Sequence, residues 1–364
     1  MPRAYLPRRN VKNLMQDEKI LVWLPSPMGD AVLCTPALRA LRRHFESSEI
    51  TFYANSVVRN VLSPGRFNDV WLEQKNRNPF KIAQDFREHK FTSAVLFKNS
   101  FASALAIFLA SIPSRIGYAR EGRGFMLTEK LYPPKLSAAG FKPFSMIDYY
   151  LAIVSWLGCD TSDRNPELLI DPQAGVNLKT KLPQLAHADR PIVVLVPGGA
   201  FGPSKCWLSE RFAKTADWLI DNYKAKVVVS VSPVDAEKRI ADEICSSSRN
   251  RLINLAETPL SLGELKSLFS MASLVITNDT GPRHIAGALK CKIITLFGPN
   301  NPTWTEADYQ NEIQIVGKAP CVPCDKPVCK QNEHLCMQAI TVEMVCRAAE
   351  KLLEIKSSST GFRV

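Results

Sequence analysis

An aspartate stands on the first turn of a predicted helix, directly after a buried strand. The run "ILVWL" at 20–24 is continuous and apolar, and the bend at Pro27–Gly29 brings Asp30 to the start of the helix that follows. Open α/β sheets bind their ligands at the edge where the strands end. Asp30 is therefore either an acid that faces a ligand or a cap for the free N–H groups of the helix.

A glycine-rich loop that carries a lysine follows another strand. The loop "PGGAFGPSKCW" at 197–207 precedes a helix, and its glycines allow backbone N–H groups to approach a ligand closely. The helix N-terminus and the positive charge of Lys205 together favour a diphosphate. Neither G-x-G-x-x-G nor G-x-x-x-x-G-K-[ST] is present, which argues against dinucleotide-binding and P-loop NTPase sites. A purely structural turn is the alternative.

The segment "TNDTGPRHIAGAL" at 277–289 repeats this order of strand, polar turn and helix. Asp279 and Thr280 stand at the helix start with Gly281, and His284 falls on the first turn. Taken alone, the aspartate fits a helix cap and the histidine fits a structural role. Two polar turns at strand ends of one domain favour a ligand site instead.

Four of the ten cysteines lie together in "CVPCDKPVCKQNEHLC" near the C-terminus. A C-x2-C pair followed by two more thiols can close a tetrahedral zinc site, although the later spacing is not that of a zinc ribbon. Free thiols are the alternative, because a disulfide framework is not expected in a cytoplasmic chain. The candidate zinc ligands are Cys321, Cys324, Cys329 and Cys336.

The composition is that of a globular protein with an anionic partner. Of 364 residues, 46% are hydrophobic and 22% are charged, and the formal net charge is +11. This charge favours a nucleic acid, a phosphorylated metabolite or an anionic membrane surface, but no nucleic-acid-binding signature supports the first. No apolar run reaches the roughly 18 residues that cross a bilayer, and the N-terminus is no signal peptide. We therefore expect a cytoplasmic protein without a transmembrane segment.

Strands and helices alternate along the chain, which predicts α/β architecture with parallel sheets covered on both faces. In the first half we expect strands at 19–24, 49–54, 69–73 and 93–97, and helices at 30–45, 79–88, 100–110 and 145–157. A second series contains strands at 191–197 and 225–232 and helices at 209–222, 234–246 and 341–355.

Turn-forming residues without sustained periodicity at 158–190 predict a linker between two domains. We expect one Rossmann-like domain over residues 1–175 and a second over residues 176–340. A C-terminal helix is expected within residues 341–364.

Taken together, the motifs resemble those of bacterial lipopolysaccharide heptosyltransferases, which form glycosyltransferase family 9. The resemblance rests on "PSPMGDAVLCTPALRALRRHF", "PGGAFGPSKCW" and "TNDTGPRHIAGAL…ITLFGP", and it extends to "RIGYAREGRGFMLTEKLY" and the cysteine segment. The form "FGPSKCW" and the cysteines are most similar to the heptosyltransferase II branch. The family has the GT-B fold, in which two Rossmann-like domains face each other across a cleft. It implies that the last helix packs back on the N-terminal domain.

The resemblance also implies a role for each candidate residue. Asp30 would be the general base, which takes the proton from an acceptor hydroxyl as that oxygen attacks the donor's anomeric carbon with inversion. Lys205 and helix N-termini would stabilise the charge on the leaving ADP, so no cofactor is required. The implied donor-binding residues are Gly199, Gly202, Ser204, Lys205, Asp279, Thr280, Gly281 and His284. The implied acceptor-binding residues are Arg115, Arg120 and Arg123.

The implied function is transfer of heptose from ADP-heptose to the inner core of a lipopolysaccharide precursor. The acceptor would be an anionic lipid A–core molecule at the inner leaflet, reached by a cytoplasmic protein peripheral to the inner membrane. One position departs from the family, because Val234 stands where an acid usually contacts the donor nucleoside, and Asp235 or Glu237 is left to replace it. A GT-B transferase with another nucleotide sugar or acceptor stays an alternative. A basic nucleic-acid-binding protein is the alternative from a different class.

Overall fold

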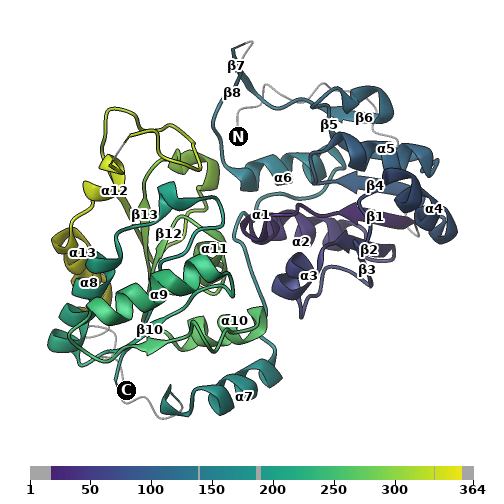
Figure 1. Ribbon diagram of the computed structural model, residues 1–364. Coiled ribbons are helices and arrows are strands. Elements are labelled where there is room, and N and C mark those ends of the chain that lie inside the picture. Colours follow the sequence, from purple (N-terminus) through teal and green to yellow (C-terminus); the bar gives the residue numbers. More distant parts are fainter. Residues whose placement is uncertain (1–17, 138–139, 186–189, 332, 355–364) are drawn as a thin grey trace, which may run out of the picture. The chain divides into compact units, whose positions relative to one another are not determined.

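The computed structural model describes residues 18–137, 140–185, 190–331 and 333–354, and the chain divides into two compact units (Figure 1). The first unit comprises Met1–Leu168 with Thr303–Ala307, and the second comprises Leu169–Pro302 with Asp308–Val364. The chain thus changes unit a few residues before the boundary expected at 175/176. No sequence pattern predicted that the short segment Thr303–Ala307 belongs to the first unit.

The first unit is built on a parallel sheet with the strand order β3-β2-β1-β4-β5-β6. Its strands are β1 (Lys19–Trp23), β2 (Glu49–Ala54), β3 (Val70–Glu73), β4 (Ser93–Leu96), β5 (Ser114–Tyr118) and β6 (Glu129–Leu131). The chain extends the sheet from β1 to one side and then, from β4, to the other side. Doubly wound folds bind ligands at such a switch point, at the C-terminal ends of the strands. A two-stranded antiparallel sheet of β7 (Lys135–Ser137) and β8 (Gly140–Phe141) follows.

Helices cover both faces of this sheet (Figure 1). On one face, α4 (Pro79–His89) and α5 (Phe101–Leu109) share a buried cluster with alternate strand residues such as Leu21 and Trp23. The helices that pack on one another over the other face are α1 (Met28–Leu33), α2 (Thr35–His44), α3 (Ser56–Leu62) and α6 (Met146–Trp156). The short 3-10 helix η2 (Arg123–Met126) lies against α5.

A proline divides the helix expected at 30–45 into α1 and α2. Pro36 lies in the first turn of α2 and has no N–H to donate to the carbonyl of Val32. The hydroxyl of Thr35 donates to that carbonyl instead, at 2.8 Å. The same hydroxyl accepts the N–H of Glu167 at 3.0 Å, so one buried side chain serves two backbone groups.

The second unit repeats the strand order of the first, as β11-β10-β9-β12-β13-β14, again with parallel neighbours. Its strands are β9 (Ile192–Val196), β10 (Lys226–Val229), β11 (Ile253–Asn254), β12 (Leu274–Asn278), β13 (Ile293–Phe297) and β14 (Glu312–Val316). The switch point of this sheet lies between β9 and β12. Both loops that the sequence marks as ligand-binding begin there.

The helices of the second unit also form two layers. Those that share a core with one face of the sheet are α8 (Ser209–Tyr223), α9 (Asp235–Ser247), α12 (Leu335–Gln338) and α13 (Val342–Glu354). Those that pack on one another elsewhere in the unit are α7 (Pro172–Lys181), α10 (Leu262–Met271) and α11 (Gly281–Ala288). The 3-10 helices described in this unit are η3 (Pro183–Leu185) and η4 (Pro203–Lys205), and η5 (Pro302–Thr305) begins in this unit and continues in the segment that belongs to the first unit.

The last helix, α13, packs inside the second unit. Its apolar stripe, which includes Val345, Ala349 and Leu352, is buried against α8 and the sheet. The chain that enters α13 is held by the indole N–H of Trp207, which donates to the carbonyl of Ile340 at 3.0 Å. The apolar face of α13 is thus used within its own unit, and packing of this helix on the N-terminal domain stays a prediction.

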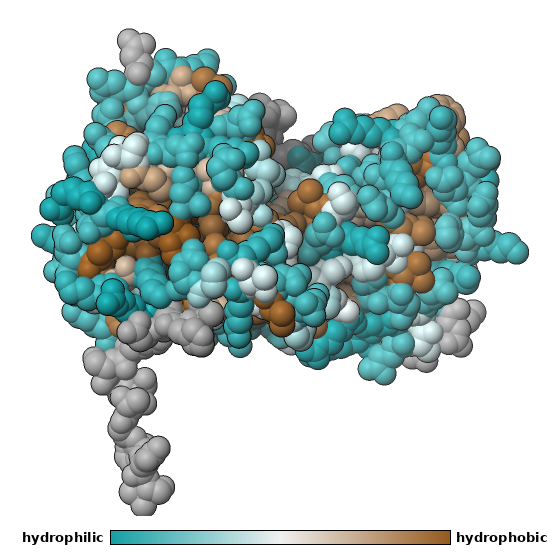
Figure 2. Space-filling model, turned by 60° about the horizontal axis from the view of Figure 1, so that its bottom comes forward, coloured by the Kyte–Doolittle hydropathy of each residue, from teal (hydrophilic) through white to brown (hydrophobic). Residues whose placement is uncertain are grey.

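No helix of the described residues is both long and apolar enough to cross a membrane. On the face drawn in Figure 2, hydrophilic residues predominate, with hydrophobic side chains visible between them. On that face, hydrophilic side chains thus surround the hydrophobic areas.

Replacement of Thr35 by valine tests whether the Thr35 hydroxyl stabilises the chain where α1 ends and α2 begins. The carbonyl of Val32 and the N–H of Glu167 lose a buried partner, so we expect the free energy of unfolding to fall by about 2–4 kcal/mol. Thr35→Ser keeps the hydroxyl and should cost only about 1 kcal/mol for the lost methyl group. Urea unfolding followed by circular dichroism compares the two, and equal stabilities would contradict the account.

Candidate functional site

The loop after β9 and the turn after β12 form one site, because these two strands are parallel neighbours. Val196 pairs with Thr277 near the strand ends, so both segments leave the sheet at the same edge. Asn278 joins them, since its Oδ1 accepts the N–H of Trp207 at 3.3 Å and its Nδ2 donates to the carbonyl of Pro197 at 2.6 Å. The two motifs predicted to bind a ligand therefore lie together.

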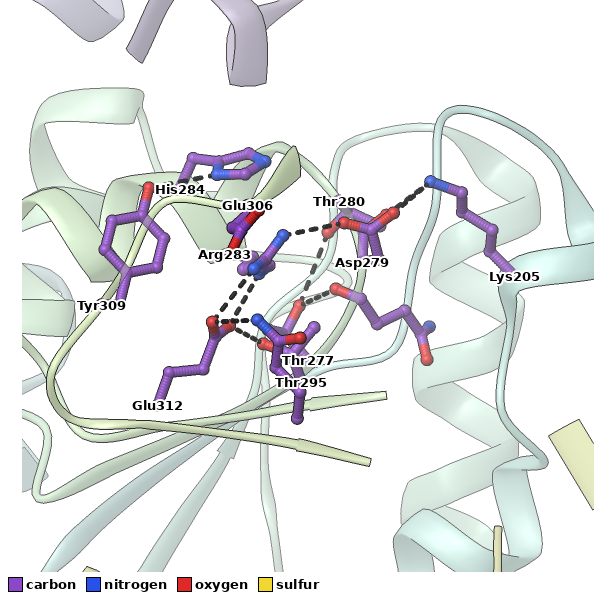
Figure 3. Close-up of polar contacts among 12 residues, drawn as sticks. Lys205, Thr277, Asp279, Thr280, Arg283, His284, Thr295, Glu306, Tyr309 and Glu312 are labelled. Carbon is purple, nitrogen blue, oxygen red and sulfur yellow. Dashed lines mark hydrogen bonds and ion pairs between the residues drawn. The ribbon is translucent and has the colours of Figure 1, made fainter. Parts of the chain in front are cut away.

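Lys205 and Asp279 form an ion pair at the centre of this site (Figure 3). Nζ of Lys205 lies 2.7 Å from Oδ2 of Asp279 and 2.9 Å from its carbonyl oxygen. The ring centroid of Phe201 is 4.9 Å from the same Nζ. Burial opposes ionisation of Asp279, but Lys205 and Arg283 outweigh it and hold the pKa of the carboxyl below its usual range. Asp279 is therefore ionised and pairs with Lys205, which is only 8% exposed.

Arg283 lies on the other side of Asp279, and the sequence analysis did not single it out. Its Nη1 is 3.2 Å from Oδ1 of Asp279, and its Nε and Nη2 contact the two carboxylate oxygens of Glu312 at 2.7 and 3.0 Å (Figure 3). Burial alone would lower the pKa of Arg283, but its bonds to Glu312 raise it. Positive and negative charges thus alternate along four side chains, which we call the charge row: Lys205, Asp279, Arg283 and Glu312.

Glu312 has further donors that fix its carboxylate. The hydroxyl of Thr295 donates to Oε1, and the amide of Gln314 donates to Oε2 at 2.8 Å. Burial would raise the pKa of Glu312, but Arg283 and these donors lower it. The carboxylate therefore stays ionised at the end of the charge row opposite Lys205. Sequence reasoning missed Glu312 because it opens β14, far along the chain from the two motifs.

His284 points from the first turn of α11 to a half-buried tyrosine. Its Nδ1 lies 3.1 Å from the hydroxyl of Tyr309. Gly287 makes room for that ring, because a Cβ at this position would overlap it. Burial, followed by the charge of Arg283, lowers the pKa of His284 to about 3. The imidazole is therefore neutral near pH 7 and can donate one hydrogen bond without adding charge.

The glycine-rich loop is tied to the cysteine segment. Gly202 has φ +149°, and a Cβ there would overlap the carbonyl of Pro327. The buried hydroxyl of Ser204 donates to the carbonyl of Lys326 at 2.6 Å. We expected Gly202 and Ser204 to contact the donor, but in the structure they contact the cysteine segment at Lys326 and Pro327. The expected donor residues nearest the charge row are Gly199, Thr280 and Gly281.

Asp30 occupies the matching place in the first unit, after β1 at the switch point. The cap of α1 is Pro27, so Asp30 is a residue of the first turn and the cap alternative is wrong. Among the residues that the structure describes, its carboxylate has no hydrogen-bond or ion-pair partner. Burial raises its pKa to about 6. Such a carboxylate can accept and release a proton near neutral pH.

Arg123 does not have the surroundings expected of an acceptor-binding residue. Its side chain is fully buried, and its guanidinium donates to the carbonyls of Tyr118 at 2.9 Å and Lys98 at 2.8 Å and to Oδ1 of Asn99 at 2.9 Å. It ties η2 to the loop after β4. Backbone carbonyls already use the donors of Arg123, so its surroundings do not support an acceptor-binding role, which stays a prediction.

The other two predicted acceptor arginines also contact their own unit. Arg115 donates to the carbonyl of Met126 at 2.7 Å, and its guanidinium lies 5.5 Å from the ring centroid of Phe108. Nη1 of Arg120 lies 3.5 Å from the hydroxyl of Tyr149. A role for Arg115 or Arg120 at an acceptor stays a prediction.

The structure does not support the zinc site predicted at the four cysteines, and the site stays a prediction. Among the described residues, no three His, Cys, Asp or Glu side chains are placed to hold a metal ion. Cys336 is buried at the start of α12, where its Sγ lies close to Gly298, whereas Cys321, Cys324 and Cys329 are half-buried free thiols. The spacing of Cys321 and Cys324 did not indicate the directions of the Cys329 and Cys336 side chains.

The turn after β10 carries the acid that could replace the family's nucleoside contact. Val234 is the cap of α9 and is 58% exposed, and Asp235 is exposed beside it. The carboxylate of Glu237 instead accepts the N–H of Ser232 at 2.9 Å and lies where a Cβ of Gly198 would be. Glu237 is thus the acid of this turn that contacts the glycine-rich loop.

The model of glycosyltransferase family 9 (heptosyltransferase) matches residues 79–335, which is more than half of the chain and includes the charge row. The chain belongs to glycosyltransferase family 9. It is therefore a glycosyltransferase, which leaves the nucleic-acid-binding alternative without support.

Its relatives extend over most of the chain. It is 29% identical over 303 residues to the lipopolysaccharide heptosyltransferase 2 of Escherichia coli, with 79% of this chain and 84% of that one covered. The lipooligosaccharide heptosyltransferase 2 of Campylobacter jejuni is 23% identical over 339 residues, with coverage of 92% and 99%. The solved ADP-heptose lipopolysaccharide heptosyltransferase II of E. coli matches with a TM-score of 0.75 and 24% identity, covering 93% of this chain and 100% of that one. The predicted GT-B fold is confirmed.

Replacement of Glu312 by glutamine tests whether the charge row stabilises this glycosyltransferase. The buried guanidinium of Arg283 would lose its ionised partner Glu312, so we expect a loss of about 3 kcal/mol in the free energy of unfolding. Glu257→Gln is the matched control, because the side chain of Glu257 is 84% exposed and should contribute little. Denaturant unfolding measures both, and equal effects would show that the row is not a stabilising unit.

Proposed function

We propose that this protein transfers heptose from ADP-heptose to the inner core of a lipopolysaccharide precursor, with inversion at the anomeric carbon. Family 9 membership and relatives named as lipopolysaccharide heptosyltransferases support the substrate class. The single observation that carries the proposal is the charge row, which holds a lysine at the switch point of the second sheet. On this proposal the protein works in the cytoplasm at the inner membrane, where its lipid acceptor lies.

Lys205 and the start of α11 are suited to a nucleoside diphosphate. The ammonium of Lys205 is held by two oxygens of Asp279, and the first N–H groups of α11 lie beside it. As the bond between the sugar and the diphosphate breaks, negative charge grows on the β-phosphate. A cation and N–H groups that are in place beforehand stabilise this charge without reorganisation. His284, which is neutral, can donate to a phosphate or sugar oxygen.

For the nucleoside we propose Glu237 in place of the missing acid at Val234. Its carboxylate lies against Gly198 of the loop that carries Lys205, whereas Asp235 is exposed. A carboxylate at this place can accept hydrogen bonds from ribose hydroxyls. This assignment supports ADP-heptose without excluding another nucleotide sugar.

Asp30 is the proposed general base. With a pKa of about 6, its carboxyl group is mostly ionised at pH 7 and still basic enough to accept a proton from a sugar hydroxyl. The acceptor oxygen then attacks the anomeric carbon on the face opposite the diphosphate, which gives inversion. Asp30 and Lys205 belong to different units, so the proposed reaction requires both units to act on one pair of substrates.

Asp30→Asn tests the base directly. Asparagine has nearly the same shape but accepts no proton, so we expect transfer from ADP-heptose to fall by a factor of about 100 or more. The affinity for ADP should not change. For the wild type, kcat/KM should rise with pH up to about 6 and level off above it, because only ionised Asp30 is active.

The stability of the same variant separates a chemical role from a structural one. Because burial raises the pKa of Asp30 in the folded state, ionised Asp30 opposes folding above pH 6, and the loss of this charge should not lower Tm. A variant that keeps more than a few per cent of the activity, or a pH profile that is flat between pH 5 and 7, would refute the role of Asp30.

A further inference from the structure

Exposed aromatic side chains are concentrated in one part of the first unit. Among the described residues, those of residues 80–132 are Phe80 (66% exposed), Phe101 (44%), Phe108 (43%), Phe125 (68%) and Tyr132 (65%). Elsewhere in the described chain, Phe201 in the glycine-rich loop is the one large aromatic residue with comparable exposure, at 40%. This distribution marks α5 and the residues around η2 as an unusual surface.

The helix α5 is apolar on its solvent side as well as on its buried side. Its sequence, FASALAIFL, contains no charged residue. Phe101, Leu105, Phe108 and Leu109 follow helical spacing and are exposed or half-buried, and the ring of Phe125 lies 6.4 Å from that of Phe101. A helix that is apolar all round is normally covered on all sides. We call these five residues the α5 stripe.

Basic groups flank the α5 stripe at its C-terminal end. Arg87 of α4 donates to the carbonyl of Leu109 at 2.6 Å, and the guanidinium of Arg115 lies over the ring of Phe108. Between residues 77 and 132, lysine and arginine outnumber aspartate and glutamate by nine to four. The charge of this region therefore complements an anionic surface, despite the nearby acids on α4 and at Glu121.

We propose that the α5 stripe binds the surface of an anionic lipid bilayer. The nine residues of α5 are about 14 Å long, which is too short to cross a bilayer core of about 30 Å but enough to lie in its interface. Phenylalanine rings then enter the headgroup region, and arginines reach the lipid phosphates. The inference rests on the proposed function in one respect: a lipid acceptor is met at a bilayer.

Flotation of the full-length protein with vesicles tests this surface. We expect the wild type to bind phosphatidylcholine vesicles that contain phosphatidylglycerol, to bind pure phosphatidylcholine much less, and to lose affinity as salt is added. The double variant Phe101→Ser/Phe108→Ser should bind the anionic vesicles at least about tenfold more weakly. The matched control, Val57→Ser/Val176→Ser, removes exposed apolar side chains elsewhere and should bind as the wild type does.

Two further measurements make each outcome decisive. Transfer to a soluble, deacylated acceptor should be the same for the wild type and the double variant, whereas transfer to an acceptor in vesicles should fall for the variant. Equal vesicle binding by the double variant and the control would overturn the proposal. So would light scattering that shows a dimer broken by the double substitution without vesicle binding, because the stripe would then bind a second copy. A wild type inactive on both acceptors would refute the proposed function while the vesicle result still stood.

Discussion

The proposed donor site depends on the buried ion pair between Lys205 and Asp279. A charge in the interior costs several kcal/mol of lost hydration, so it is stable there only with close partners of opposite sign. The charge row meets this condition by alternation, with Arg283 and Glu312 completing two positive and two negative groups. The ammonium of Lys205 is thereby fixed before any ligand arrives, which is what stabilisation of a leaving diphosphate requires.

Two charged residues of the first unit, Arg123 and Asp30, have surroundings that differ from those of the charge row. Arg123 is surrounded by carbonyl oxygens and an amide, which satisfy its donors and link η2 to the loop after β4. Asp30, by contrast, has no such partner among the described residues, and its burial raises the pKa of its carboxyl. The two sheets have the same strand order, but the switch point of the second carries Lys205 paired with an acid, whereas that of the first carries the carboxylate of Asp30. This difference matches the two chemical tasks of a glycosyl transfer.

Sequence patterns predicted the candidate site residues of each unit that lie next to strand ends. Asp30, Lys205, Asp279 and His284 all follow apolar runs within short polar turns, so local order was enough to find them. Arg283 and Glu312 were missed, because their partnership joins α11 to β14 across 29 positions. The cysteine spacing predicted a metal site that no grouping of side chains among the described residues supports, since spacing alone does not determine where side chains point. The packing of α13 likewise depends on which apolar face it meets in its own unit.

The affinity for ADP, measured by titration calorimetry, tests most directly whether the charge row prepares Lys205 for a diphosphate. The account predicts that Lys205→Ala weakens ADP binding about tenfold or more, because a charge-assisted contact to phosphate is lost. Lys214→Ala, which removes an exposed lysine of α8, should leave the affinity unchanged. Unchanged ADP affinity in a folded Lys205→Ala protein, or equal losses in the two variants, would contradict the account.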